Sequence, residues 1–169
     1  MSSVTPSPRD RRRATTEVKG ALRELSLQLT LLDRQVSARV SLKDVDLDCL
    51  DLINRTGPLT PTALARQANL HPATLTGILD RLERAGWIAR ERDPEDRRAM
   101  RIRALRERNG ELISLYAGMN SAIDAICDDY SDTDLALLTD FLTRATAAGQ
   151  TAAQDLAAPD TPNTTGTTD

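Results

Sequence analysis

The stretch TLTGILDRLERAGWIARERDPEDRRAMRIR, residues 74–103, decides the fold, because two kinds of periodicity meet in it across one glycine. Four apolar residues in its first half recur at helical spacing and predict a helix with one apolar face: Leu75, Ile78, Leu79 and Leu82. Gly86 ends this helix. Two short alternating runs follow, residues 87–90 and 100–103, and the charged, turn-forming segment between them predicts a β-hairpin.

A second short helix is predicted immediately upstream of this stretch. Thr60 and Pro61 provide an N-cap and a first-turn proline, and Pro72 takes the same first-turn position in the next helix. Two short helices joined by a tight turn are typical of a helix-turn-helix. A further helix is predicted at residues 45–53.

Heptad-like spacing predicts three longer helices outside this region. They cover residues 16–40, residues 109–129, and a segment up to residue 148 that begins at a capping box on Ser131. We expect these helices, at 16–40 and 109–148, to form a separate bundle from both chain ends that dimerises the protein. The polar tails, residues 1–15 and 149–169, are predicted to be disordered.

Composition favours a mostly α fold with a small β-hairpin. The 169 residues include one Trp, one Phe and two Tyr, so aliphatic side chains must build the core. No apolar run long enough for a membrane span or a secretory signal is present, which predicts a cytoplasmic protein. The single histidine and two distant cysteines predict no metal site and no cofactor, and no catalytic motif is found, so we expect no enzyme.

The net charge of −3 hides a strong segregation of charge along the chain. Residues 81–108 hold ten basic and six acidic side chains, whereas residues 109–169 hold one basic and ten acidic side chains. A polyanion such as DNA would therefore be attracted to the hairpin region and repelled by the C-terminal part.

The segment LTPTALARQANLHPATLTGILDRLERAGWIARERDPEDRRAMRIR, residues 59–103, closely resembles the winged helix-turn-helix of MarR-type transcriptional regulators. The resemblance rests on LDRLERAGW, on the DPEDRR wing and on the flanking long helices, and it covers about residues 16–148. It implies a homodimer that binds double-stranded DNA at an inverted repeat, through a DNA-binding domain at residues 41–108. It also implies repression or activation of nearby promoters, often with release by a small aromatic or phenolic effector or by oxidation.

Carried onto this chain, the resemblance assigns DNA contacts to the second helix of the pair and to the wing. The expected DNA-binding residues are Pro72, Ala73, Thr74, Thr76, Gly77, Arg81, Arg97, Arg98 and Arg101. Arg98 matches the minor-groove arginine of the family, and Asp80 and Asp96 match acids that orient the wing. Effector-binding residues stay unknown, because ordinary apolar side chains line such pockets.

Two alternatives remain open at this level. A winged helix could serve only protein contacts, although six arginines on one hairpin favour DNA: Arg90, Arg92, Arg97, Arg98, Arg101 and Arg103. A thiol-based redox regulator is the other alternative. Cys49 lies among aspartates and is predicted to be a small buried hydrophobe, which leaves Cys127 as the remaining thiol candidate.

Overall fold

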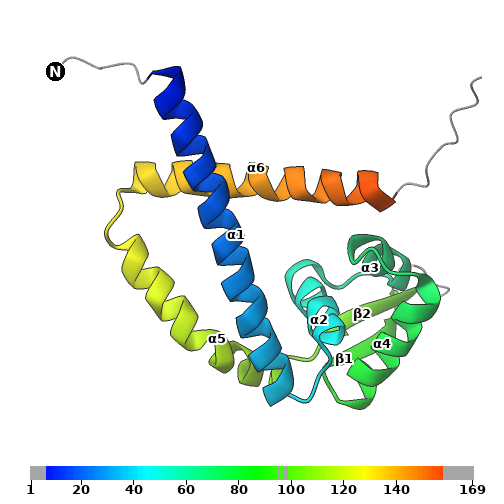
Figure 1. The fold of residues 1–169 in the computed structure, drawn as a ribbon. Coiled ribbons are helices and arrows are strands. Elements are labelled where there is room, and N and C mark those ends of the chain that lie inside the picture. Colours follow the sequence, from blue (N-terminus) through cyan, green and yellow to red (C-terminus); the bar gives the residue numbers. More distant parts are fainter. Residues whose placement is uncertain (1–6, 95, 97–98, 158–169) are drawn as a thin grey trace, which may run out of the picture. The chain divides into compact units, whose positions relative to one another are not determined.

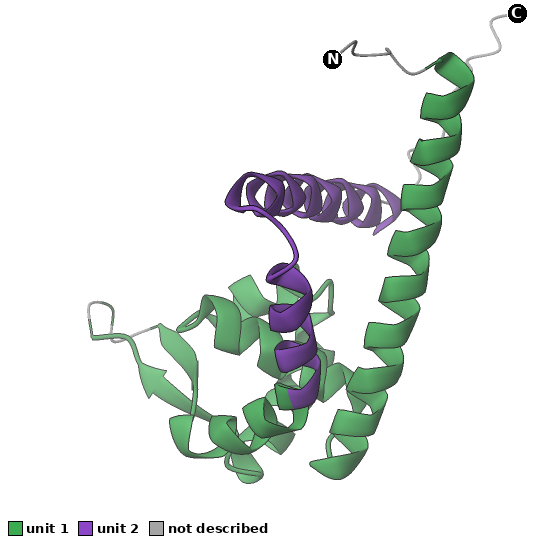
Figure 2. Ribbon diagram, turned by 90° about the vertical axis from the view of Figure 1, so that its left-hand side faces the viewer, with its two compact units in different colours: residues 1–117 green, residues 118–169 purple. Residues whose placement is uncertain are grey.

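The computed structural model describes residues 7–94, 96 and 99–157, and these are mostly helical with one two-stranded antiparallel sheet, as predicted. The elements in chain order are α1 (Pro8–Arg39), α2 (Asp44–Thr56), α3 (Pro61–Gln67), α4 (Pro72–Arg84), β1 (Ile88–Arg92), β2 (Met100–Ala104), α5 (Arg106–Cys127) and α6 (Asp132–Ala157) (Figure 1). The chain divides into two compact units, residues 1–117 and residues 118–169 (Figure 2). No helix among the described residues is both long and apolar enough to cross a membrane.

Helices α3 and α4 begin where the sequence predicts them. Thr60 Oγ1 accepts a hydrogen bond from the Ala63 N–H (3.2 Å), and His71 Nδ1 accepts one from the Ala73 N–H (3.3 Å). Each cap satisfies a backbone donor that the first turn leaves without a helical partner. Gly86 follows α4 with φ +74, a left-handed conformation that glycine adopts without steric cost. The chain can therefore turn directly from α4 into the hairpin.

The hairpin of β1 and β2 and the loop that connects these strands, residues 88–104, are named the wing. The base of the wing packs into the core through Ile88 and Ile102. Ile88 pairs with Ala104, and Arg92 pairs with Met100. Leu59 exchanges two backbone hydrogen bonds with Ile102, of 3.1 and 2.8 Å. The segment before α3 therefore forms an isolated antiparallel β-bridge to β2. Trp87, just before β1, is fully buried in the core.

One hydrophobic core lies within the first unit. Its members come from the end of α1, from α2, α3 and α4, from the wing and from the start of α5: Val36, Val40, Leu47, Cys49, Leu50, Ile53, Leu59, Leu64, Ala65, Leu75, Ile78, Leu79, Leu82, Trp87, Ile88, Ile102 and Leu112. The four apolar residues predicted for one face of α4 are all in it. This core sets the angle at which α4 presents its opposite face.

Two predicted boundaries are wrong, both at the ends of the long helices. Helix α1 begins at Pro8 and not at residue 16, because Ser7 and Asp10 form a capping box in front of it. Helix α6 continues past Gly149 to Ala157, so residues 149–157 are not disordered. The segment TAAQDLA is rich in strong helix formers, which offset the cost of about 1 kcal/mol for a glycine in a helix.

The start of α6 is as predicted. Ser131 Oγ accepts a hydrogen bond from the Asp134 N–H (3.2 Å), and the Ser131 N–H donates to Asp134 Oδ2 (3.3 Å). The aspartate thus takes the part usually played by glutamate in a capping box. Helix α5 begins at Arg106, three residues before the predicted start at residue 109.

Candidate nucleic-acid interface

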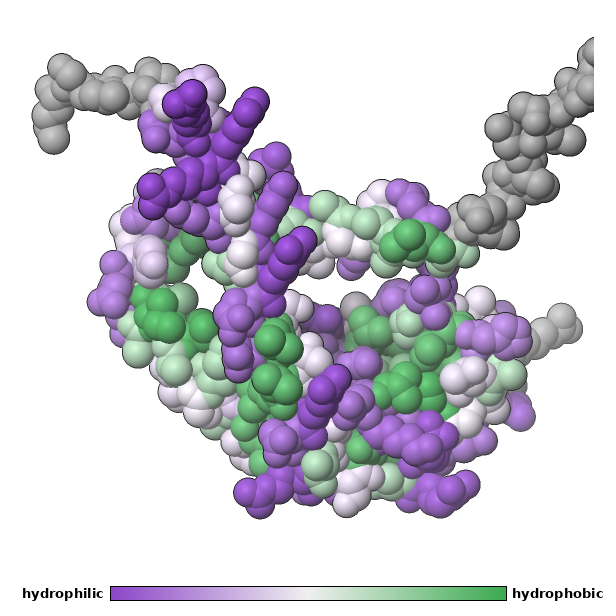
Figure 3. Space-filling model, in the orientation of Figure 1, coloured by the Kyte–Doolittle hydropathy of each residue, from purple (hydrophilic) through white to green (hydrophobic). Residues whose placement is uncertain are grey.

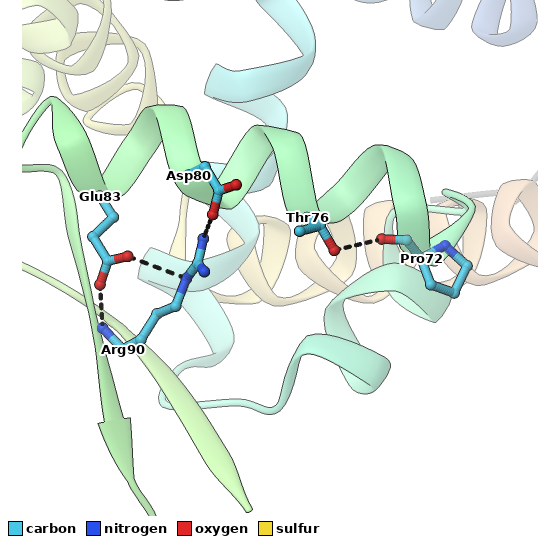
Figure 4. A network of polar contacts seen from close by, with 5 residues as sticks. All are labelled: Pro72, Thr76, Asp80, Glu83 and Arg90. Carbon is cyan, nitrogen blue, oxygen red and sulfur yellow. Dashed lines mark hydrogen bonds and ion pairs between the residues drawn. The ribbon is translucent and has the colours of Figure 1, made fainter.

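The N-terminal half of α4 presents an exposed face of small residues. Pro72, Ala73, Thr74 and Thr76 are exposed, and Gly77 is half-buried. Thr76 Oγ1 donates a hydrogen bond to the Pro72 carbonyl (3.0 Å), so its own lone pairs stay available as acceptors (Figure 4). Helical ends of this kind, small and polar, can approach base edges in a major groove. Five of the six expected contact residues of α4 therefore share one surface.

One flank of α4 is bound to the wing through Arg90 of β1. Arg90 Nη2 lies 2.5 Å from Asp80 Oδ1, and Arg90 Nε lies 3.4 Å from Glu83 Oε2 (Figure 4). The Arg90 backbone N–H also donates to Glu83 Oε1 (3.3 Å). The expected pairing of Asp80 with the wing is thus present in the structure. These contacts fix the wing against the helix.

The other flank of α4 is bound to α2 through Arg81. From the sequence, Arg81 is expected to contact DNA. In the structure its Nε and Nη2 donate to the two carboxylate oxygens of Asp46, at 2.9 and 2.6 Å. The hydrogen bond to Asp46 raises the pKa of Arg81 above its ordinary value. Such a fork is the strongest geometry of an arginine–carboxylate pair, so Asp46 holds α4 against α2.

The loop of the wing is organised by Asp93, which the sequence did not single out. Asp93 is buried, its Oδ2 lies 2.5 Å from Arg101 Nε, and its backbone N–H donates to the Ala99 carbonyl (2.9 Å). The Asp96 N–H reaches Asp93 Oδ1 at 3.5 Å. The sequence signal that could have identified Asp93 is the proline that follows it, because an Asp-Pro pair favours the start of a turn.

The arginines of the wing divide into two groups. Arg90, Arg101 and Arg103 are each ion-paired with an acid of the chain, the last with Glu91 at 2.7 Å. Arg92 is exposed, and Arg97 and Arg98 lie outside the described residues. Much of the positive charge that the sequence shows on this hairpin is therefore matched internally.

A further arginine, Arg108 of α5, holds the C-terminal end of α4. Its Nη1 donates to the Ala85 carbonyl (2.5 Å), and its guanidinium lies 4.0 Å from the centre of the Trp87 ring. A cation at a helix C-terminus and over an indole face is favourable on both counts. No local sequence signal marks Arg108 or Asp46, because their partners lie 23 and 35 positions away.

The two thiols lie in different surroundings. Cys49 is fully buried in the core, as predicted, and burial together with Asp48 and Asp46 raises its pKa to about 11. The thiol is therefore protonated near neutral pH, which is the unreactive form. Cys127 is half-buried at the end of α5.

Comparison with known proteins agrees with this architecture. The MarR family model matches residues 42–100. The uncharacterized HTH-type transcriptional regulator YcgE of Bacillus subtilis (strain 168) is 30% identical over 123 residues, which is 73% of this chain and 80% of that protein. The HTH-type transcriptional repressor YetL of the same strain is 38% identical over 76 residues, 45% of this chain and 46% of that protein.

Among solved structures, a MarR family protein from Bacillus stearothermophilus superposes with a TM-score of 0.62, at 22% identity, over 81% of this chain and 96% of that chain. At this identity the likeness shows the fold alone. The sequence relatives add the family, since the match to YcgE extends over most of both proteins and includes the helix-turn-helix and the wing. The chain accordingly belongs to the MarR family of transcriptional regulators.

Proposed function

We propose that this DNA-binding regulator acts as a homodimer that binds an inverted repeat in double-stranded DNA and represses transcription from it. The observation that carries the proposal is the exposed N-terminal face of α4, which is braced on one flank by Asp46 and on the other by Arg90. A helix held this rigidly can enter a major groove without a further ordering cost. Repression is supported by the name of YetL, and no catalytic activity is part of the proposal.

The dimer is supported by apolar side chains that the chain leaves exposed on its long helices. They lie on α1, α5 and α6: Val18, Leu25, Leu27, Leu29, Leu31, Ile113, Ile123, Ile126, Leu137, Leu138, Phe141 and Leu142. Green apolar surface is visible along α1 and α6 in Figure 3. Residues 16–40 and 109–148 would supply the interface, leaving residues 41–108 for DNA. A two-fold dimer presents the same helix twice, which requires an inverted repeat.

Within each half-site the parts have different roles. Pro72, Ala73, Thr74, Thr76 and Gly77 would face base edges, because they share the exposed surface of α4. For the wing, the assignments of Arg98 to the minor groove, of Asp96 to orienting it, and of Arg97 to phosphate rest on the family resemblance. For Arg101 the Nε is bonded to Asp93, so only its remaining N–H groups would bind a phosphate.

A small aromatic or phenolic effector that releases the DNA is the remaining part of the proposal, and it rests on family membership alone. Binding to the folded state would raise its stability by mass action, so a thermal-shift screen of such compounds tests it. A regulator of this kind acts where the chromosomal DNA is, in the cytoplasm.

Footprinting on the DNA upstream of the protein's own gene tests the proposal. We expect two protected half-sites related by inversion, with centres about 10 base pairs apart or a small multiple of that distance. Protection of one asymmetric half-site would contradict the proposal that the protein binds DNA as a two-fold dimer. Absence of any protection across promoter fragments, with a folded protein, would favour a winged helix that serves protein contacts.

The wing is tested on the same DNA with Arg98→Ala. We expect affinity for the site to fall about tenfold or more, about 1.4 kcal/mol, because the narrow minor groove loses its cation. Competition titrations against unrelated DNA measure this. Equal affinity of the folded variant and the wild type would remove the minor-groove role from Arg98.

A further inference from the structure

Asp46 is an unusual member of the core region, because it is a carboxylate that is only 2% exposed. It is the third residue of α2, where the helix N-terminus favours a negative charge. A buried carboxylate is costly unless it is paired and hydrogen-bonded. The partner of Asp46 is Arg81 of α4, whose Nε and Nη2 each donate a hydrogen bond to one of the two Asp46 carboxylate oxygens.

This pair uses only one edge of the guanidinium. A guanidinium has five N–H donors in a planar fork, and the Asp46 carboxylate takes two of them, one on Nε and one on Nη2. The donors that remain are the other N–H on Nη2 and the two on Nη1. Among the described residues, Nη1 makes no hydrogen bond. The Arg81 side chain is 37% exposed, although its partner is buried.

Gly77 shows where this second edge lies. A Cβ built on Gly77 would meet Arg81 Nη1 at 3.6 Å, so the guanidinium extends back along α4 by one turn, beside Gly77. Gly77 belongs to the surface formed by Ala73, Thr74 and Thr76. The unbonded edge of Arg81 therefore borders the face that the proposed function turns toward DNA.

We infer that Asp46 is a positioning residue, which locks the Arg81 guanidinium so that its Nη1 edge binds a phosphate of the DNA backbone next to α4. The inference rests on the proposed DNA binding and assigns a separate role to each edge of the Arg81 guanidinium. One edge of Arg81 holds α4 to α2, and the other edge holds the phosphate. An arginine fixed in this way loses no side-chain freedom when the phosphate arrives, and its planar fork fits a phosphate in two-point contact.

The competing interpretation is that the pair only joins α2 to α4. Both interpretations predict a loss of stability when either residue is replaced. They differ in the salt dependence of DNA binding, because each phosphate neutralised contributes about 0.9 to the slope of log affinity against log salt. A purely structural arginine contributes nothing to that slope.

The test uses the full chain and the DNA fragment identified by footprinting, with affinity measured by fluorescence anisotropy at several salt concentrations. Arg81→Gln is expected to reduce the slope by about 1.8, from one phosphate in each half-site, and to weaken binding at least about tenfold at low salt. Asp46→Asn is expected to weaken binding several-fold with little change of slope, because the cation is still present but is no longer held. In the Arg81→Gln background, Asp46→Asn should weaken binding no further.

Two more variants keep the outcome clear. Arg55→Gln removes a surface arginine of α2 that pairs with Asp51 at 3.1 Å, and it should leave the slope unchanged. Arg81→Lys keeps the positive charge but removes the planar guanidinium, so it should retain most of the slope of log affinity against log salt while binding several-fold more weakly. If Asp46→Asn does not fold, Arg81→Lys takes its place in the test. Circular dichroism verifies folding of each variant.

Two results would overturn the inference. One is a wild-type slope and affinity for folded Arg81→Gln. The other is an Asp46→Asn effect that is as large with Gln at position 81 as with Arg. Both leave the proposed function intact, since they require a wild type that binds its site. A wild type that binds no DNA would instead remove the proposed function.

Discussion

The winged-helix region, residues 42–104, and the second unit, residues 118–157, are both well-formed structure, but they are stabilised in different ways. Nearly all of the buried apolar residues lie in the first, and the rest belong to the adjoining ends of α1 and α5. Helix α6 has no buried residue over its 26 positions. The first region is thus held by its own core, whereas no apolar side chain among the described residues of the second unit is fully buried.

The two regions depend on different interactions for their stability. Tertiary packing of an apolar face provides most of the stability of protein helices, and isolated helices are marginal in water. In α6 the exposed residues Leu138, Phe141 and Leu142 recur at helical spacing, as core residues do. This exposed apolar pattern is what the proposed dimer would bury.

The largest expected effect comes from a cavity in the first region. Leu82 is fully buried in α4, so Leu82→Ala should lower the free energy of unfolding by about 2–5 kcal/mol. Urea denaturation at equal protomer concentration measures it. Leu156→Ala, at a position 88% exposed in α6, should change stability by no more than about 0.5 kcal/mol. A similar loss of unfolding free energy in both variants would contradict the proposed difference between the two regions.

Breaking the proposed interface is the next largest effect. Phe141→Asp removes an apolar anchor from each copy, about 1.5–3 kcal/mol per side chain, so the dimer dissociation constant should rise about a hundredfold or more. Sedimentation equilibrium measures this. Thr143→Asp adds the same charge nearly on the opposite side of α6 and should leave the dimer intact. A wild type that is monomeric at low micromolar concentration would contradict the dimer.

The buried Cys49 thiol reports how tightly the first region is closed. In a Cys127→Ser variant at pH 8, Cys49 should be alkylated about a hundredfold more slowly in the folded protein than in urea, because its pKa rises from 9.0 to about 11. The same shift stabilises the fold below pH 9, and this contribution is lost as the pH rises toward 11. Equal alkylation rates in folded and unfolded protein would show that the first region opens readily.

The smallest effect separates two glycines inside helices. Gly77→Ala and Gly149→Ala should each stabilise the protein by up to about 1 kcal/mol, since alanine is the better helix former and neither new Cβ meets an atom closer than 3.6 Å. Only Gly77→Ala should weaken DNA binding, because its methyl group enters the exposed face of α4 beside Arg81. Thermal melts and anisotropy titrations measure the two properties. Weaker binding by both variants would point to an indirect cause.

The sequence predicted the elements well wherever a local signal existed. Prolines at the first turns of α3 and α4, the glycine after α4 and the capping box of α6 all stand where the structure has them. The ends of α1 and α6 were missed for a physical reason. Polarity and the absence of heptads predict disorder, but a capping box and alanine-rich composition stabilise a helix without an apolar seam.

The candidate site was predictable only in part. The exposed residues of α4 follow from the helical period, because the buried positions fix the remaining face. The ion pairs of Asp46 with Arg81 and of Asp93 with Arg101 join residues that lie 35 and 8 positions apart in the sequence, and neither composition nor spacing reveals such partners. The pairing of Asp80 with the wing was expected only from the family resemblance. The number of arginines in the wing therefore overstates its net positive charge, since three of them are already paired with acids.

The stacking of Arg108 on Trp87 gives the natural protein an optical probe. Trp87 is the only tryptophan in the chain, so all indole emission arises where α4 ends and β1 begins. The emission of an indole depends on the charges and solvent around it, and here the Arg108 guanidinium of α5 lies over the ring. Any rearrangement of the start of α5 that withdraws Arg108 will change the colour or intensity of that emission. Unlabelled protein can therefore report, in real time, how the junction of α4 and α5 responds to DNA or to a small molecule.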